Sequence, residues 1–80
     1  MTIYPNEFRL FKVIENKRTH AKIYLYHKSI CLFKGEIKNI SPERFDRLKI
    51  FLEELIQINN SKLPIKFGVI EVQKFLEGFK

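Results

Sequence analysis

The 80-residue chain contains no tryptophan, a single cysteine and only three glycines. One cysteine cannot close a disulfide within the chain, and we expect Cys31 to face inward on a strand and to behave as a small hydrophobe. No apolar run approaches the roughly 20 residues that span a bilayer. The first residues, MTIYPNEF, lack the basic and then apolar pattern of a signal peptide. These absences predict a cytoplasmic protein of a reducing compartment, neither secreted nor embedded in a membrane.

Motifs of enzymes, metal sites and phosphate-binding loops are missing as well. The chain has no Cys-x-x-Cys pair, no His-Glu-x-x-His motif and no glycine-rich loop. His20 and His27 fall on opposite faces of one expected strand, so they cannot hold a metal together. Glu53 and Glu54 are adjacent on an expected helix and point in different directions. We therefore expect no catalytic residues, no metal, no cofactor and no small-molecule substrate.

Apolar residues are plentiful. Hydrophobic residues make up 45% of the chain, and eight of them are phenylalanine, so a packed core is expected. A chain of this length forms one domain near the lower limit for folding without disulfides or metal, which makes support from a second chain, as in a homodimer, a reasonable expectation.

Positive charge is concentrated in the first half of the chain. The net charge is +6; residues 1–40 hold eight Lys or Arg against three Glu, which gives +5, and residues 41–80 hold seven against six acids, which gives +1. Clustered cations attract polyanions and gain from counterion release. A lysine-rich and arginine-poor composition is also what an AT-rich genome produces, so charge alone does not choose between the two explanations.

Residues 19–37 predict a β-hairpin with two different faces, one apolar and one basic and aromatic. With a period of two, Ala21, Ile23 and Leu25 share one face, and Lys22, Tyr24, Tyr26 and Lys28 share the other. An earlier strand is expected over residues 7–15. A two-residue turn at Asn16 and Lys17 would pair residues whose numbers sum to 33, which places these pairs on the core face: Phe8–Leu25, Leu10–Ile23, Lys12–Ala21. The same register places these on the outer face: Arg9–Tyr24, Phe11–Lys22, Glu15–Arg18.

The second turn, near residues 27–30, has no glycine, and its length is set by the faces of the strands it joins. A two-residue loop at Lys28 and Ser29 would place Ile23 opposite Lys34 and mix core with charge. We therefore predict a loop one residue longer. It pairs Leu25 with Phe33 and His27 with Cys31 inside, and outside it gives these pairs: Tyr24–Lys34, Lys22–Glu36.

A helix over residues 42–59 is the clearest single element. Ser41 suits an N-cap and Pro42 suits the first helical turn. The apolar stripe is roughly 160° wide at 100° per residue, more than one sheet contact requires. Its excess, at Phe51 and Ile58, must be covered by the C-terminal segment or by a second copy of the chain, and Ile50 lies alone on the polar side. These residues form a candidate oligomer interface: Ile50, Phe51, Ile58.

The remaining segment predicts a second helix over residues 66–77, although residues 62–72 are also compatible with a strand. The sequence therefore predicts an α+β fold in one domain. A three-stranded antiparallel β-meander over residues 7–38 precedes the long helix and the shorter C-terminal helix. A fourth strand is expected only if residues 2–4 supply it.

The outer face of the predicted sheet combines aromatic rings with cations. Proteins that hold single-stranded nucleic acid use rings for base stacking and cations for the phosphates. The predicted binding residues are Arg9, Phe11, Lys22, Tyr24, Tyr26, Lys28 and Lys34, with Lys28 at the rim. Tyrosines are also good strand formers and lysines keep a sheet soluble, so the pattern is equally compatible with a face that binds nothing. The pattern does not distinguish DNA from RNA.

The junction KGEIKNISPERFDRLKIFLEELI resembles the strand-to-helix junction of single-stranded DNA-binding transcription cofactors of the positive-cofactor-four type and, more distantly, of the Whirly proteins. The matching residues are Ile40, Ser41, Pro42, Glu43, Phe45, Leu48 and Leu52. The resemblance implies a curved sheet that binds single strands, dimerisation through the helix, and a role in transcription, replication or recombination. It covers about a quarter of the chain, residues 62–80 have no counterpart, and no DNA-contacting residue carries over.

A second function class stays open. As the alternative, the wide apolar stripe and Ile50 favour a small accessory or regulatory protein, for example a viral or plasmid-borne one, that binds a partner protein through its helices or a sheet edge.

Overall fold

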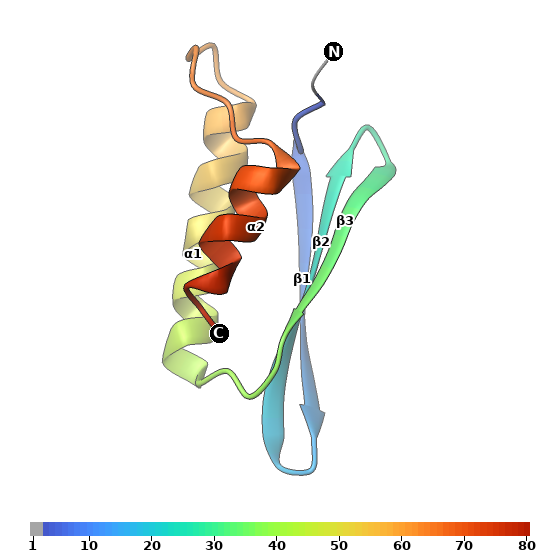
Figure 1. The fold of residues 1–80 in the computed structure, drawn as a ribbon, viewed down its shortest axis with the longest axis vertical. Coiled ribbons are helices and arrows are strands. Elements are labelled where there is room, and N and C mark those ends of the chain that lie inside the picture. The colour runs from blue at the N-terminus through green and yellow to red at the C-terminus, as the bar shows by residue number, and fades with distance from the viewer. Residues whose placement is uncertain (1–2) are drawn as a thin grey trace.

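The computed structural model describes residues 3–80, and these form a three-stranded antiparallel sheet followed by two helices (Figure 1). The elements are β1 (Glu7–Glu15), β2 (Arg18–His27), β3 (Ile30–Ile37), α1 (Pro42–Asn59) and α2 (Val69–Glu77). The strand order is β1-β2-β3, which confirms the predicted α+β meander. Of the residues considered for a fourth strand, Thr2 lies outside the described residues, and Ile3 and Tyr4 are not in a strand.

The register between β1 and β2 is the predicted one over its whole length, from Glu7 opposite Tyr26 to Glu15 opposite Arg18. The turn between these strands has positive φ angles at both central residues, 52° at Asn16 and 62° at Lys17. Two positive φ angles are characteristic of the type I′ turn, whose twist matches that of the flanking strands.

The turn between β2 and β3 differs from the prediction. It is a two-residue turn at Lys28 and Ser29, with φ angles of 47° and 72°, and not a longer loop. The expected pairing holds from Ala21 opposite Ile37 to Leu25 opposite Phe33, and the register then shifts by one residue. The shift pairs Tyr26 with Cys31 and His27 with Ile30, so that Leu32 is the extra residue of a β-bulge.

The bulge corrects two predictions at this end of the sheet. His27 does not pair with Cys31, and Cys31 is exposed instead of facing the core. The physical reason is that one extra residue reverses the facing of every strand residue on its far side.

Helix α1 has the bounds that the sequence predicts, Pro42 to Asn59. The Ser41 side chain accepts a hydrogen bond from the Arg44 backbone N–H at 3.2 Å and thereby caps the first turn. Its buried residues are Phe45, Leu48, Leu52, Leu55 and Ile56. The C-terminal segment covers the excess of the stripe at Phe51, because the Phe51 ring lies 5.4 Å from Phe75 and 6.0 Å from Phe79 between centroids.

Helix α2 begins at Val69, three residues later than predicted, and residues 62–68 are neither helix nor strand. Side chains at the end of α1 and in the loop form hydrogen bonds with backbone groups here and keep this segment out of the helix. The Asn59 amide binds both the N–H and the C=O of Phe67, and the Lys66 ammonium donates to the carbonyls of Asn59 and Ser61 at 3.0 and 2.6 Å. With its backbone groups already bound, Phe67 has no need of helical partners.

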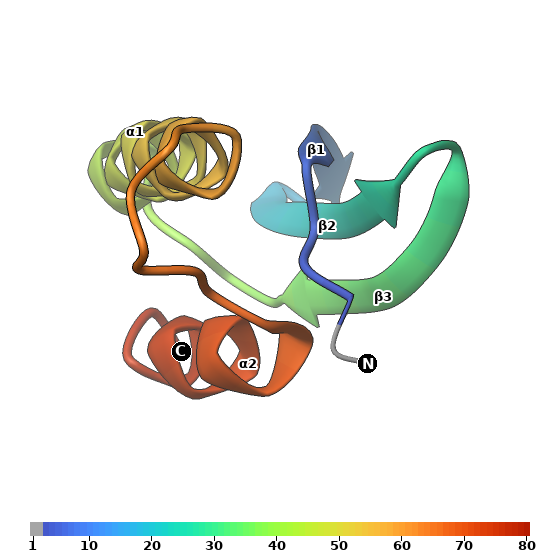
Figure 2. The ribbon, with the colours of Figure 1, turned by 90° about the horizontal axis from the view of Figure 1, so that it is seen from above.

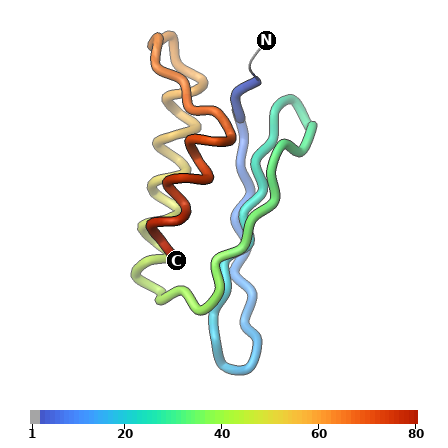
Figure 3. The backbone as a smooth tube through the Cα atoms, in the orientation of Figure 1, coloured from blue at the N-terminus to red at the C-terminus, as the bar shows by residue number. Residues whose placement is uncertain are grey.

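The core lies between the sheet and the helix layer. Ala21, Ile23 and Leu25 of β2 are fully buried there, together with Leu48 and Leu52 of α1, and Val72 and Leu76 of α2 complete the layer. Viewed from above, both helices lie on the same side of the sheet (Figure 2). The backbone trace shows the same two layers, with the chain crossing from β3 into α1 at one end (Figure 3). The opposite face of the sheet therefore has no covering layer among residues 3–80.

Candidate functional site

The uncovered face of the sheet contains six of the seven predicted binding residues, and we call it the open face: Arg9, Phe11, Lys22, Tyr24, Tyr26, Lys34. The pairing brings them together, because Arg9 lies opposite Tyr24, Phe11 opposite Lys22, and Tyr24 opposite Lys34. Burial alternates along β2 accordingly, with Ile23 and Leu25 fully buried and both tyrosines only partly buried. Tyr24 and Tyr26 thus point away from the core, as their alternation with Ile23 and Leu25 predicts.

On the open face two aromatic rings contact each other and the third contacts a cation. Phe11 and Tyr24 meet edge to face, with centroids 5.6 Å apart and planes inclined at 76°. The Arg9 guanidinium carbon lies 5.3 Å from the centre of the Tyr26 ring, a cation–π distance. Phe11 is 48% exposed although it is a large apolar side chain. The open face therefore holds one aromatic pair, Phe11 with Tyr24, and one ring beside a cation, Tyr26, on a surface that solvent reaches.

Among the described residues 3–80, the cations of the open face have no ion-pair partner. Within residues 3–80 the one ion pair closer than 4 Å joins Lys80 to Glu77, on the helix layer. Lys22 lies opposite Glu36 in the ladder without reaching that distance. The amino and guanidinium groups of Arg9, Lys22 and Lys34 consequently remain available to an anion from solution.

Lys28 and Cys31 lie at the edge of the open face. Lys28 is exposed in the β2–β3 turn, where its backbone N–H donates to the Asn6 side chain at 3.3 Å, so it sits at the rim as predicted. Cys31, opposite Tyr26, joins the same face because of the bulge. The sequence analysis did not predict this position of Cys31. The only signal for it was that a two-residue turn at Lys28 and Ser29 did not fit the alternation of core and surface residues along the strands.

A polar hollow of about 540 Å³ lies near the β1–β2 turn, lined by Glu15, Asn16, Arg18, His20, Glu36 and Lys38. The His20 Nδ1 accepts a hydrogen bond from the Asn39 N–H at 3.0 Å, so this imidazole nitrogen already has a partner. In the part of the chain that the structure describes, no group of three or more His, Cys, Asp or Glu residues is arranged to hold a metal ion.

The three candidate interface residues on α1 are in different environments. Ile50 is 55% exposed, Phe51 is packed against the C-terminal segment, and Ile58 is partly buried near the end of the helix. They do not form one continuous exposed surface, because Phe51 is engaged within the chain.

Comparisons with known proteins give no match: no family model, no curated protein and no solved structure matches this chain. Within residues 3–80, neither helix has the length and apolar character needed to cross a membrane.

Proposed function

We propose that the open face binds single-stranded nucleic acid, in a process such as transcription, replication or recombination. The observation that carries the proposal is the combination on one uncovered face of three aromatic rings with three cations that have no ion-pair partner in residues 3–80. The resemblance of the strand-to-helix junction to single-stranded DNA-binding cofactors favours the same function.

The two kinds of side chain have separate tasks in this proposal. Phe11, Tyr24 and Tyr26 stack on bases, and each stacked base contributes about 1 to 3 kcal/mol. Lys22 and Lys34, from neighbouring strands, bind phosphates beside the rings, and Arg9 does so from above Tyr26. Because every base has a π-face, binding of this type depends little on sequence.

The test is a fluorescence-anisotropy titration with labelled single strands of DNA and RNA of about 12 nucleotides, within the length that such sheets bind. The double variant Lys22→Ala/Tyr24→Ala loses one stacking ring and one phosphate contact, so we expect binding about 10- to 100-fold weaker at low salt. The matched control, Lys49→Ala/Ile50→Ala, removes the same charge and an exposed apolar side chain from α1, and we expect wild-type binding. Equal binding by both double variants, or a wild-type chain that binds neither strand, contradicts the proposal.

A further inference from the structure

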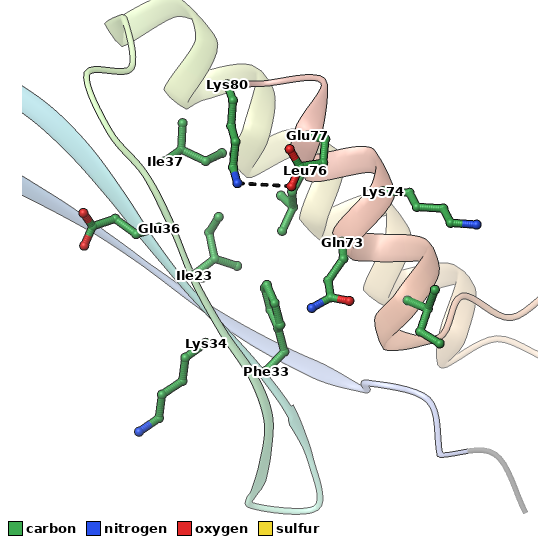
Figure 4. Close-up of a pocket in the computed structure, with 12 residues that line it drawn as sticks. Ile23, Phe33, Lys34, Glu36, Ile37, Gln73, Lys74, Leu76, Glu77 and Lys80 are labelled. Atoms are coloured by element: carbon green, nitrogen blue, oxygen red, sulfur yellow. Dashed lines mark hydrogen bonds and ion pairs between the residues drawn. The ribbon is translucent and has the colours of Figure 1, made fainter.

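A second surface lies on the other side of the molecule, in a groove between β3 and α2 with a volume of about 560 Å³. Its apolar lining comes from the inner face of the sheet and from the helix: Ile23, Phe33, Ile37, Ile70 and Leu76. The close-up shows Phe33 pointing toward α2, whereas Lys34 and Glu36 point away from it (Figure 4). The groove is therefore distinct from the open face.

Gly35, which lines the groove, leaves room for the Phe33 ring on the inner face of β3. Gly35 lies between Phe33 and Ile37 on the inner face of β3, and a Cβ at this position would lie 2.7 Å from two ring atoms of Phe33. The Phe33 ring leans into the space that a side chain would fill. Helix α2 lies beside β3, set toward the free edge of the sheet, whereas α1 lies beside β1 and β2 (Figure 2). A strand added next to β3 would lie against α2.

The free edge of β3 also offers backbone hydrogen-bonding groups. The residues that flank a two-residue turn form a hydrogen-bonded pair, here His27 and Ile30, and such pairs alternate along an antiparallel ladder. Gly35, opposite Ile23, therefore directs its N–H and C=O toward β2, and Lys34 and Glu36 direct theirs to the free edge. Two observed bonds agree with this alternation, because the Thr19 carbonyl accepts from Ile40 on the β3 side and the Tyr26 carbonyl accepts from Asn6 on the β1 side.

The opposite edge of the sheet is protected. β1 packs against α1, and Lys12 on its inner face places its ammonium 4.8 Å from the centre of the Phe45 ring. An inward-pointing charge on an edge strand opposes the addition of another strand. On β3 the residue across β2 from Lys12 is Ile37, and the next inner position is Gly35, so neither of these positions carries a charge.

We propose that the groove binds an extended peptide segment of a partner protein, which adds as a fourth strand beside β3 with apolar side chains toward α2 and acidic side chains alternating with them. Main-chain bonds to Lys34 and Glu36 supply affinity, and the apolar groove selects alternate side chains. Charge favours an acidic partner, because the side chains of the added strand that do not face α2 would lie on the face of the sheet that carries Arg9, Lys22 and Lys34. This inference does not rest on nucleic-acid binding, although the added strand would lie beside Lys34 of the open face.

The probe is a fluorescent peptide of about eight residues, the length of β3, in which valine alternates with aspartate and threonine. The decisive variant is Glu36→Pro, which removes an edge N–H without removing a bond to β2 and leaves the fold intact. Its control is Glu36→Ala, which removes the same charge and keeps the N–H. Ile70→Ser alters the groove wall at a side chain that is 66% exposed, and its control is Ile50→Ser, a similarly exposed isoleucine on α1.

We expect the wild-type chain and both controls to bind the probe, and Glu36→Pro and Ile70→Ser to bind it about tenfold more weakly or not at all. A probe with lysine in place of aspartate should bind more weakly than the acidic one. In hydrogen exchange, the probe should slow the amides of Lys34 and Glu36. A wild-type chain that does not bind the probe overturns the proposal, and so does binding that Glu36→Pro leaves unchanged. Light scattering that shows a dimer abolished by Glu36→Pro also overturns it, because the occupant would then be a second copy of the chain.

Discussion

Asn59, the last residue of α1, joins three segments of the chain through one amide side chain. Its Nδ2 donates to the Pro5 carbonyl at 2.8 Å and to the Phe67 carbonyl at 2.9 Å, and its Oδ1 accepts from the Phe67 N–H at 2.7 Å. The side chain thereby ties the residues before β1 and the loop before α2 to the helix end. The position of α2 over the core depends on this contact.

Asn59→Ala should therefore destabilise the fold. The substitution removes three partly buried hydrogen bonds and leaves the Phe67 N–H without its acceptor, so we expect a loss of about 2 to 4 kcal/mol in the free energy of unfolding. The measurement is urea denaturation followed by circular dichroism.

Asn60→Ala is the matched control, because the neighbouring asparagine makes one exposed hydrogen bond, to the Asn6 carbonyl at 3.0 Å. Its cost should be about 1 kcal/mol or less. Similar midpoints for the two variants would show that Asn59 does not hold the segments together.

The environment of a residue could be predicted from the sequence where the alternation of a strand determines it. It could not be predicted where a contact with a residue distant in the sequence determines it. Tyr24 and Tyr26 face outward because they alternate with Ile23 and Leu25, and that alternation is visible in the sequence. The partners of Asn59 are 54 and 8 residues away, and no local pattern identifies them. The late start of α2 could not be predicted for the same reason.

Among the elements, both hairpin turns use positive φ angles without a glycine. Asn16 and Lys17 have φ of 52° and 62°, and Lys28 and Ser29 have 47° and 72°. Asparagine tolerates this region, whereas lysine and serine are strained there by contact between Cβ and the backbone. Replacing a strained turn residue by one that tolerates a positive φ angle should therefore stabilise the fold.

Lys17→Gly should stabilise the chain, because it produces the Asn-Gly pair that type I′ turns prefer. Relief of the left-handed conformation at one residue is worth about 1 kcal/mol, which should raise the thermal midpoint by several degrees. Lys17→Ala removes the same charge but keeps a Cβ, so its midpoint should stay near the wild-type value. Equal midpoints for the glycine and alanine variants would contradict the role of backbone strain.

Element boundaries followed from sequence where capping and periodicity agree. Helix α1 begins after Ser41 and ends at Asn59 because the cap, the proline at its start and the apolar stripe all point to the same bounds. The register of β1 and β2 followed from matching both faces at once. The predicted length of the turn after His27 was wrong, because a short turn with a bulge and a longer loop give the same pairing over residues 21–25.

At the scale of the whole molecule, two layers 42 Å long and 17 Å in the thinnest direction leave one sheet face open and one groove at the sheet edge. The positive charge of residues 1–40 lies within the sheet and its flanks, and the helix layer is nearly neutral. The positive charge of the molecule is therefore concentrated in the sheet, and the salt concentration should strongly affect the affinity of the open face for an anionic ligand.

The logarithm of the binding constant for a single strand should fall linearly with the logarithm of the salt concentration. Three phosphate contacts, from Arg9, Lys22 and Lys34, give an expected slope of about −2, at about −0.7 for each contact. Lys22→Ala should make the slope shallower by about 0.7, and Lys49→Ala on α1 should leave it unchanged. Equal slopes for all three proteins would place the phosphates elsewhere.

The bulge at Leu32 has a practical consequence for labelling. It turns the single thiol of the chain outward beside Tyr26, so a maleimide dye attaches at one position without any substitution. Emission from that dye would report occupancy of the open face directly, and a bulky adduct at the same sulfur would obstruct it. A one-residue irregularity in one strand thus provides a built-in attachment point for a reporter, at the edge of the surface whose occupancy is in question.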